Sequence, residues 1–268
     1  MSAPVTPDPW TALRRHTPAR IALGRTGASL PTSEVLGFAL AHAQARDAVH
    51  APFEAEATAA AIQALDLETV LVASAAPDRA SYLRRPDLGR TLSEAGCVAL
   101  AARTPGTCDL AIVIADGLSS TAVHAHAASL VEALLPAVRE AGWRLAPVVI
   151  ARQARVALGD AVGELLGARL VILLVGERPG LSSPDSLGAY VTFAPRVGRT
   201  DAERNCVSNI RGEGLSYEAA AFKLAWHARE ALRLGLTGVG LKDESDLAFP
   251  SAVTPPRIAP EGSRSPTG

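Results

Sequence analysis

The chain has 268 residues, enough for one large domain or two small ones, and its formal net charge is −1. This balance gives no indication of a nucleic-acid partner, because polyanions are bound by excess positive charge. Aromatic residues make up 4% of the chain and hydrophobic residues 48%, so the core must be built from Ala, Val, Leu and Ile. The three cysteines lack metal-ligand spacing and are typical of reduced, cytoplasmic thiols, and we find no apolar run of membrane-spanning length.

The first part of the chain is expected to be an arm followed by a helical region. Residues 1–30 are polar and contain several prolines, which predicts an N-terminal arm. Residues 31–104 are predicted to form a small helical N-terminal subdomain. A helix start signal at 31–34 precedes apolar residues at helical spacing over 35–50, and a short turn and a further helix are expected between residues 77 and 92.

Strands and helices alternate from residue 105 to residue 242. This alternation predicts an α/β domain with a parallel sheet and crossover helices. The tail, residues 243–268, is rich in Pro, Ser and Gly and is predicted to be flexible. The predicted strands are 110–115, 147–151, 170–175 and 190–194, and the predicted helices are 121–140, 158–166 and 216–234.

The strongest candidate site follows the apolar run 170–175, which is typical of a central strand buried on both faces. Glu177 and Arg178 come directly after it, between Gly176 and the pair Pro179-Gly180. Ligands of open α/β sheets bind beyond the carboxyl ends of the strands. The alternative is a surface ion pair, which contributes little to stability. The flanking Gly and Pro residues shape the loop more than a solvated pair requires, which favours a binding role.

Two further loops follow predicted strands. The first, residues 116–120, is either a turn with a helix N-cap at Ser119 or Ser120, or a loop at the ligand edge of the sheet. The second contains Val156. A valine there is usually a core residue, although apolar side chains also line ligand pockets.

The polar segment 201–210 contains the third candidate, Cys206. A cysteine is most often a small buried hydrophobe, and Cys206 has no evident histidine partner for nucleophilic catalysis. Asn205, Ser208 and Asn209 surround it with hydrogen-bonding groups that suit contact with an amide-rich ligand. His124 and His126 point to different faces of the predicted helix, which disfavours a shared metal.

Several well-known motifs are not found in the chain. It has no P-loop, no G-x-G-x-x-G after a strand, no H-E-x-x-H and no G-x-S-x-G. It also lacks the D-x-H-x-x-G pattern that supplies a histidine ligand in many cobalamin proteins. A nucleotide-binding α/β enzyme acting alone would need a phosphate loop, so this class is disfavoured.

Five segments, in this order, carry a specific resemblance that covers residues 10–242. The chain resembles the small (light) subunit of ethanolamine ammonia-lyase. The segments are 13–27 (LRRHTPARIALGRTG), 82–90 (YLRRPDLGR), 112–120 (IVIADGLSS), 175–188 (VGERPGLSSPDSLG) and 203–211 (ERNCVSNIR).

The resemblance implies a helical N-terminal part and a Rossmann-like, cobalamin-binding domain. It also implies an adenosylcobalamin-dependent lyase that converts ethanolamine to acetaldehyde and ammonia, with the substrate site on a large TIM-barrel partner subunit in a higher hetero-oligomer. No catalytic residue is then expected in this chain. The family's small-subunit cofactor contacts fall on Val156, Glu177 and Cys206. Because the family keeps the cofactor's own base on cobalt, the missing histidine motif agrees with it.

Two questions stay open at this point. Some relatives carry a long N-terminal extension associated with bacterial microcompartments, and only about ten residues precede the match here, so encapsulation is in doubt beside a cytoplasmic location. The alternative function is a cofactor-free structural partner subunit of a TIM-barrel enzyme, which would leave Glu177 and Arg178 unexplained.

Overall fold

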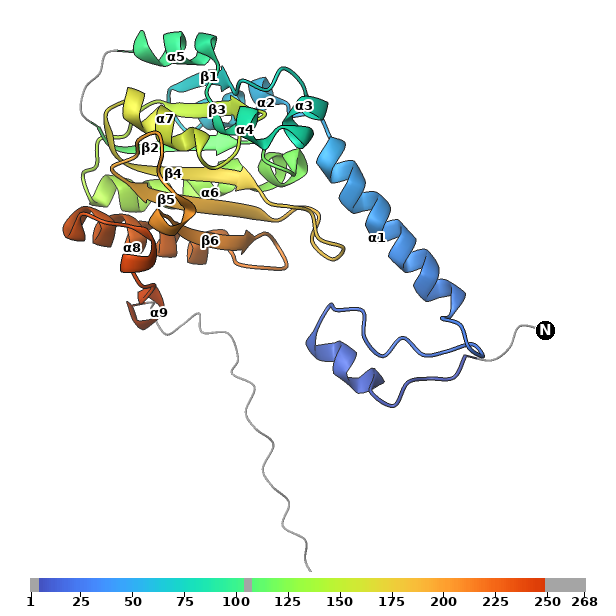
Figure 1. Ribbon diagram of the computed structural model, residues 1–268. Helices are drawn as coiled ribbons and strands as arrows, with labels where there is room; N and C mark the ends of the chain where they lie inside the picture. The colour runs from blue at the N-terminus through green and yellow to red at the C-terminus, as the bar shows by residue number, and fades with distance from the viewer. Residues whose placement is uncertain (1–4, 104–107, 249–268) are drawn as a thin grey trace, which may run out of the picture.

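The computed structural model describes residues 5–103 and 108–248. Hydrogen bonding orders its six strands β1-β3-β2-β4-β5-β6 in one sheet (Figure 1). The strands are β1 (Thr69–Ala73), β2 (Cys108–Ala115), β3 (Val148–Arg152), β4 (Ala168–Gly176), β5 (Leu187–Phe193) and β6 (Asn205–Ile210).

The two faces of the sheet are covered by different helices, because alternate side chains of each strand point to opposite faces. In β2, Leu110, Ile112 and Ile114 join one hydrophobic cluster, whereas Ala111 and Val113 join the other. The first cluster contains side chains of α2 (Ala55–Gln63), α6 (Ser120–Glu140) and α8 (Tyr217–Leu234), and the second contains side chains of α5 (Glu94–Ala101) and α7 (Leu158–Leu165).

The connections between the strands create a place for a ligand at the carboxyl ends of the parallel strands. Strand β2 leads into α6 on one face, and its neighbour β3 leads into α7 on the other. Adjacent parallel strands whose connections leave to opposite faces form a topological switch point, where a crevice opens beyond their carboxyl ends. The fold therefore places the loops after β2, β3 and β4 together.

The sheet, predicted to be parallel, is mixed. Strands β1, β3, β2 and β4 are parallel, but β5 runs antiparallel to β4 and β6 antiparallel to β5. Strand β5 follows β4 through a short loop without a crossover helix, so antiparallel pairing is the direct solution. Within the polar segment that contains Cys206, residues 205–210 form β6, which is the edge strand next to β5.

The region expected to be helical, 31–104, also contains a strand. Strand β1 lies within it and pairs with β3 at the other edge of the sheet. Its five residues alternate between buried and more exposed positions, which is typical of an edge strand. Besides α2 and α5, this region forms α1 (Thr32–His50), α3 (Arg79–Arg84) and α4 (Pro86–Arg90).

Helix α1 points away from the sheet and carries the folded N-terminal arm at its far end (Figure 1). The arm contains the short 3-10 helix η1 (Thr11–His16) and is closed by a bridge between Thr6 and Arg25. Four large apolar side chains of α1 are between 49% and 63% exposed: Val35, Leu36, Phe38 and Leu40.

The start of the segment predicted to be a flexible tail, 243–268, contains a short helix. After η2 (Asp201–Glu203) and η3 (Gly238–Gly240), residues 245–248 form α9 (Ser245–Ala248). Lys223 of α8 donates to Asp246 at 2.7 Å and to buried Ser245 at 2.9 Å, which fixes α9 to the domain. The rest of the predicted tail, 249–268, lies outside the described residues.

Among the described helices, α6 alone is long and apolar enough to cross a membrane. The sequence predicts no apolar run of that length, and α6 is the exception. Half of the relevant window is buried inside the protein. Residues such as Leu130, Leu134 and Val138 pack in the core cluster of the sheet, so α6 has the contacts of a core helix.

Candidate functional site

A cleft of about 460 Å³ opens beyond the carboxyl ends of β2, β3 and β4. This is the switch point of the sheet, where an α/β fold binds its ligands. Its volume lies within the range of about 300–1,000 Å³ that is usual for small-molecule sites. The lining residues are Tyr82, Gly117, Leu118, Arg155, Val156, Val175, Gly176, Glu177, Arg178 and Tyr190.

Glu177 lies half-buried in this cleft, held by the strand that precedes it and by a serine. Its backbone N–H donates to Ser186 O at 2.9 Å, and Ser186 Oγ donates to Glu177 Oε2. The backbone N–H of Asn209 approaches the same oxygen at 3.4 Å. In the part of the chain that the structure describes, Oε1 has no donor, so one carboxylate oxygen is available to accept a ligand N–H.

The surface-pair alternative for Glu177 is not supported. No ion pair joins Glu177 to Arg178 among the described residues, and Arg178 is exposed on the rim. A glycine is required opposite the carboxylate, because a Cβ at Gly188 would lie 2.8 Å from Glu177 Oε1. The fold therefore leaves room for this side chain in one position.

Val156 lines the same cleft from the loop between β3 and α7. The loop is pinned at two points: Arg155 N donates to Gly89 O at 2.8 Å, and Ala154 N donates to Asp116 Oδ1 at 2.9 Å. Val156 is half-buried and also packs against the core cluster on the α7 side of the sheet. Val156 therefore contacts the core and also lines the cleft.

Cys206 lies one strand beyond the cleft, on β6. It pairs across the strands with Tyr190, which does line the cleft. Its side chain is exposed, so the alternative of a buried hydrophobe is wrong. The pKa of its thiol is raised, first because neighbouring atoms remove part of its water and then because Glu177 is negative, against a bond from Tyr190. A reactive thiolate is therefore disfavoured.

The loop after β2 contains the N-cap of α6 and also lines the cleft. Ser119 is the N-cap of α6, and its side chain accepts the N–H of Ala122 at 3.2 Å. Gly117 and Leu118 line the cleft. Gly117 has a φ of 56°, and a Cβ there would lie 2.2 Å from Gly176 O, so only glycine permits this approach of the two strand ends.

Asp116, at the start of this loop, is buried and holds the neighbouring loop in place. Besides Ala154 N, it accepts from Arg79 Nη1 at 3.3 Å. Burial raises the pKa of Asp116 from 3.8 to about 6, although the bond from Ala154 N and the charge of Arg79 act in the opposite direction.

This pKa predicts a pH-dependent stability. Because the pKa is higher in the folded state, the contribution of Asp116 is fully present below about pH 4 and is lost as the pH rises through about 6. Two pKa units at about 1.4 kcal/mol each amount to roughly 3 kcal/mol. The free energy of unfolding of the wild type should therefore fall by about this amount relative to Asp116→Asn between those pH values, as measured by urea titration.

The exposed Asp66→Asn provides a control with the same change of chemistry, and its curve should run parallel to that of the wild type. Parallel curves for Asp116→Asn as well would mean that the carboxyl titrates normally in the folded protein.

Three lining residues were not recognised as site residues from the sequence: Tyr82, Arg155 and Tyr190. The ring of Tyr82 contacts two guanidinium groups, with Arg79 Cζ at 4.8 Å and Arg155 Cζ at 4.7 Å from the ring centroid. Only Arg155 carried a usable signal, since it directly precedes Val156 after a strand. Tyr82 comes from a helix 70 or more residues earlier than this loop, so only the tertiary structure brings them together.

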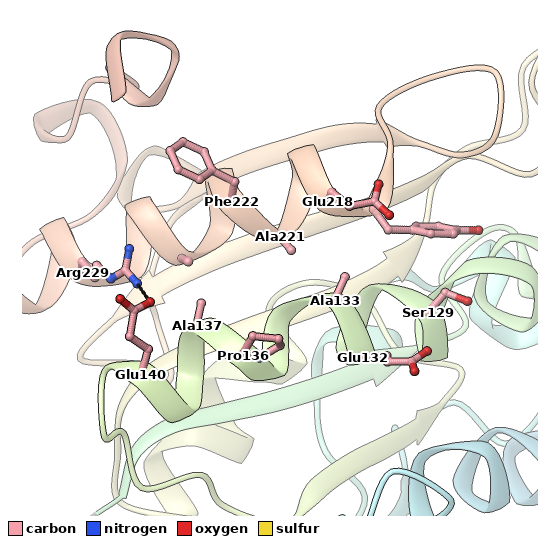
Figure 2. Close-up of a pocket in the computed structure, with 12 residues that line it drawn as sticks. Ser129, Glu132, Ala133, Pro136, Ala137, Glu140, Glu218, Ala221, Phe222 and Arg229 are labelled. Atoms are coloured by element: carbon pink, nitrogen blue, oxygen red, sulfur yellow. Dashed lines mark hydrogen bonds and ion pairs between the residues drawn. The ribbon is translucent and has the colours of Figure 1, made fainter. Parts of the chain in front are cut away.

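A second hollow, of about 710 Å³, runs between α6 and α8 (Figure 2). Small side chains form its floor, among them Ala133 and Ala221, and Glu140 pairs with Arg229 at 3.2 Å at one end. None of the three site residues expected from the sequence lines it. The cleft at the strand ends is therefore the better candidate site.

The histidines and cysteines do not form a metal site within the described residues. His124 Nε2 accepts from Glu54 N at 3.0 Å, whereas His126 Nδ1 contacts the hydroxyl of Tyr217 at 2.8 Å. The expectation that these histidines point to different faces is confirmed.

Comparison with known proteins identifies the family. Residues 7–242 match the family model described as "Ethanolamine ammonia-lyase light chain (EutC)". The chain belongs to this family. It is therefore a light-chain member of a lyase family, as the sequence resemblance indicated.

Several curated relatives are similar over nearly the whole chain, and each is called "Ethanolamine ammonia-lyase small subunit". One from Xanthomonas campestris pv. campestris is 57% identical over 265 residues, covering 97% of both chains. One from Azotobacter vinelandii is 57% identical over 249 residues, covering 92% of both chains. One from Pseudomonas syringae pv. tomato is 56% identical over 243 residues, covering 90% of this chain and 85% of the relative.

Proposed function

We propose that this chain is the small subunit of an adenosylcobalamin-dependent ethanolamine ammonia-lyase, in which it binds and orients the cobalamin against a large catalytic subunit. The observation that carries the proposal is the cleft in which Val156 and Glu177 meet, with Cys206 on the next strand. These residues are the positions to which the family resemblance assigns cofactor contacts.

The chemistry of the cleft fits a corrinoid. The corrin ring carries acetamide and propionamide arms, whose N–H groups are donors. Glu177 Oε1 is an acceptor without a donor among the described residues, and Val156 and Leu118 supply apolar contact. When bound, the cofactor supplies the radical-forming cobalt–carbon bond. This chain's share is to hold the corrin edge and to keep water from that side.

The size of the cleft supports a shared site. A cleft of about 460 Å³ suits a ligand of drug size, whereas a cobalamin is larger. A second chain must then cover the rest of the cofactor. We infer that this is the large subunit, a TIM barrel in a higher hetero-oligomer, and that the cobalamin lies at the interface.

We also infer that residues 105–242 form a Rossmann-like cobalamin-binding domain, to which β1 of the preceding region adds an edge strand. The cytoplasmic location, like the microcompartment alternative, stays a prediction. A cofactor-free structural subunit is the alternative function. Ultraviolet–visible titration with adenosylcobalamin, with and without the large subunit, separates the two functions. A purely structural subunit would bind no corrinoid itself and would leave the corrinoid affinity of the large subunit unchanged.

Replacing Glu177 should weaken cobalamin binding. Glu177→Gln keeps the shape but removes the negative charge, and Glu177→Ala removes both. Hydrogen bonds to charged groups contribute about 1.5–3 kcal/mol, so affinity should fall roughly ten- to hundredfold in the reconstituted complex. Equilibrium titration of the complex with cobalamin measures this.

The matched control is Glu132→Gln, which changes a glutamate of the α6/α8 hollow away from the cleft. It should bind cobalamin as the wild type does, and melting temperatures should show that all variants fold. Unchanged affinity in a folded Glu177→Ala complex would assign Glu177 a structural role.

A further inference from the structure

Arg155 has a free, accessible end in the cleft. Its guanidinium lies against the ring of Tyr82, and its Nη2 donates to Tyr82 O at 3.2 Å. Nε is buried without a hydrogen-bond partner, whereas Nη1 is neither buried nor bonded to any described residue. The contact with the Tyr82 ring and the Nη2 hydrogen bond hold the guanidinium in one orientation, so Nη1 has a fixed position.

The charge of Arg155 is also uncompensated. Arg79, which also lies over the ring of Tyr82, has the carboxylate of Asp116 as its counter-charge at 3.3 Å. No carboxylate forms an ion pair with Arg155 in the described ranges 5–103 and 108–248. A partly buried guanidinium without a counter-ion raises the free energy of the folded state unless an anion binds to it.

The two walls of the cleft therefore differ in charge. Glu177 provides an acceptor on the β4 side, and Arg155 provides a donor on the β3 side. A cobalamin has groups of both kinds, since its corrin arms carry amide N–H groups and its nucleotide loop carries a phosphodiester. Guanidinium groups bind phosphate oxygens through charge-assisted hydrogen bonds.

We propose that the guanidinium of Arg155 forms an anion subsite that binds the phosphodiester of the cobalamin nucleotide loop. This assignment rests on the proposed function. It orients the cofactor in the cleft, because the nucleotide loop then lies on the α7 side and the corrin amides on the side of Glu177.

Comparison of two corrinoids tests the subsite. Cobalamin has the nucleotide loop, and cobinamide lacks it together with its phosphodiester. In the reconstituted complex, Arg155→Gln should weaken cobalamin binding by at least about tenfold, the usual effect of losing a charge-assisted hydrogen bond, and should change cobinamide binding by less than about threefold. Arg155→Lys keeps the charge and should bind cobalamin more tightly than Arg155→Gln does.

Arg196→Gln is the matched control, because Arg196 is exposed and follows β5 at the end of the sheet opposite the cleft. It should leave both affinities unchanged. Melting temperatures separate a folding defect from lost binding, and a folding defect would weaken both corrinoids alike.

The possible failures are distinguishable. If the wild-type complex binds neither corrinoid, the proposed function fails, and the subsite with it. An equal loss for both corrinoids in Arg155→Gln would overturn the subsite alone and leave Arg155 a packing role against Tyr82. A titration with inorganic phosphate covers the other anion source: saturable phosphate binding that Arg155→Gln abolishes, with cobalamin affinity unchanged, would also overturn the proposal.

Discussion

Removing one partner of the buried ion pair between Asp160 and Arg204 should lower the free energy of unfolding by about 3–5 kcal/mol. The two side chains are each 2% exposed and bonded through both carboxylate oxygens, at 2.6 and 2.7 Å. Arg204 also donates to Thr192 Oγ1 at 3.1 Å and to Arg199 O at 3.0 Å. Asp160→Ala leaves the guanidinium buried without its counter-charge. Urea unfolding at neutral pH measures the loss.

The same arginine supplies the control. Asp201 lies 3.5 Å from Arg204 Nε, but its side chain is 89% exposed. Asp201→Asn should therefore cost no more than about 1 kcal/mol. Equal, small losses in Asp160→Ala and Asp201→Asn would show that water reaches the buried pair. Because α7 begins at the cleft, Asp160→Ala should also weaken cobalamin binding, in proportion to how far the helix moves.

The isolated chain should show no turnover of ethanolamine, even with adenosylcobalamin present. The cleft can cover only part of the cofactor, and the substrate site is expected on the large subunit. Addition of the large subunit should restore release of acetaldehyde and ammonia. A coupled assay with alcohol dehydrogenase and NADH measures the aldehyde.

The large subunit with cofactor but without this chain is the necessary control, and it should be inactive or nearly so. Sustained acetaldehyde release by the isolated chain would contradict the division of labour between the subunits. Full activity of the large subunit alone would assign this chain a role outside cofactor binding.

Local signals in the sequence determined the central elements of the fold. The apolar run 170–175 belongs to β4, and α6 begins after Ser119, one of the two serines considered as its N-cap. Helix α8 begins after Ser216, and both serines accept backbone N–H groups of the first helical turns. Gly235 ends α8 with a φ of 72°. Glu177 could be chosen because a strand end and its glycines are adjacent in sequence. Such features depend on neighbours within a few residues, so the sequence alone carries them.

Pairing between distant segments was decided by the tertiary structure alone. Strands β1 and β6 lie at the two edges of the sheet, where partial exposure permits polar residues and removes the continuous apolar run that marks β4. Strand β5 runs antiparallel because it returns directly beside β4 without a crossover helix.

The site itself shows the same division. Tyr82 and Arg155 are brought together from elements about 70 residues apart, and the partners Asp160 and Arg204 are 44 residues apart. The sequence determined which residue types stand at the strand ends. Only the folded chain decided that Glu177 and Arg155 face one cleft, because that depends on the strand order and on the faces to which α6 and α7 pack.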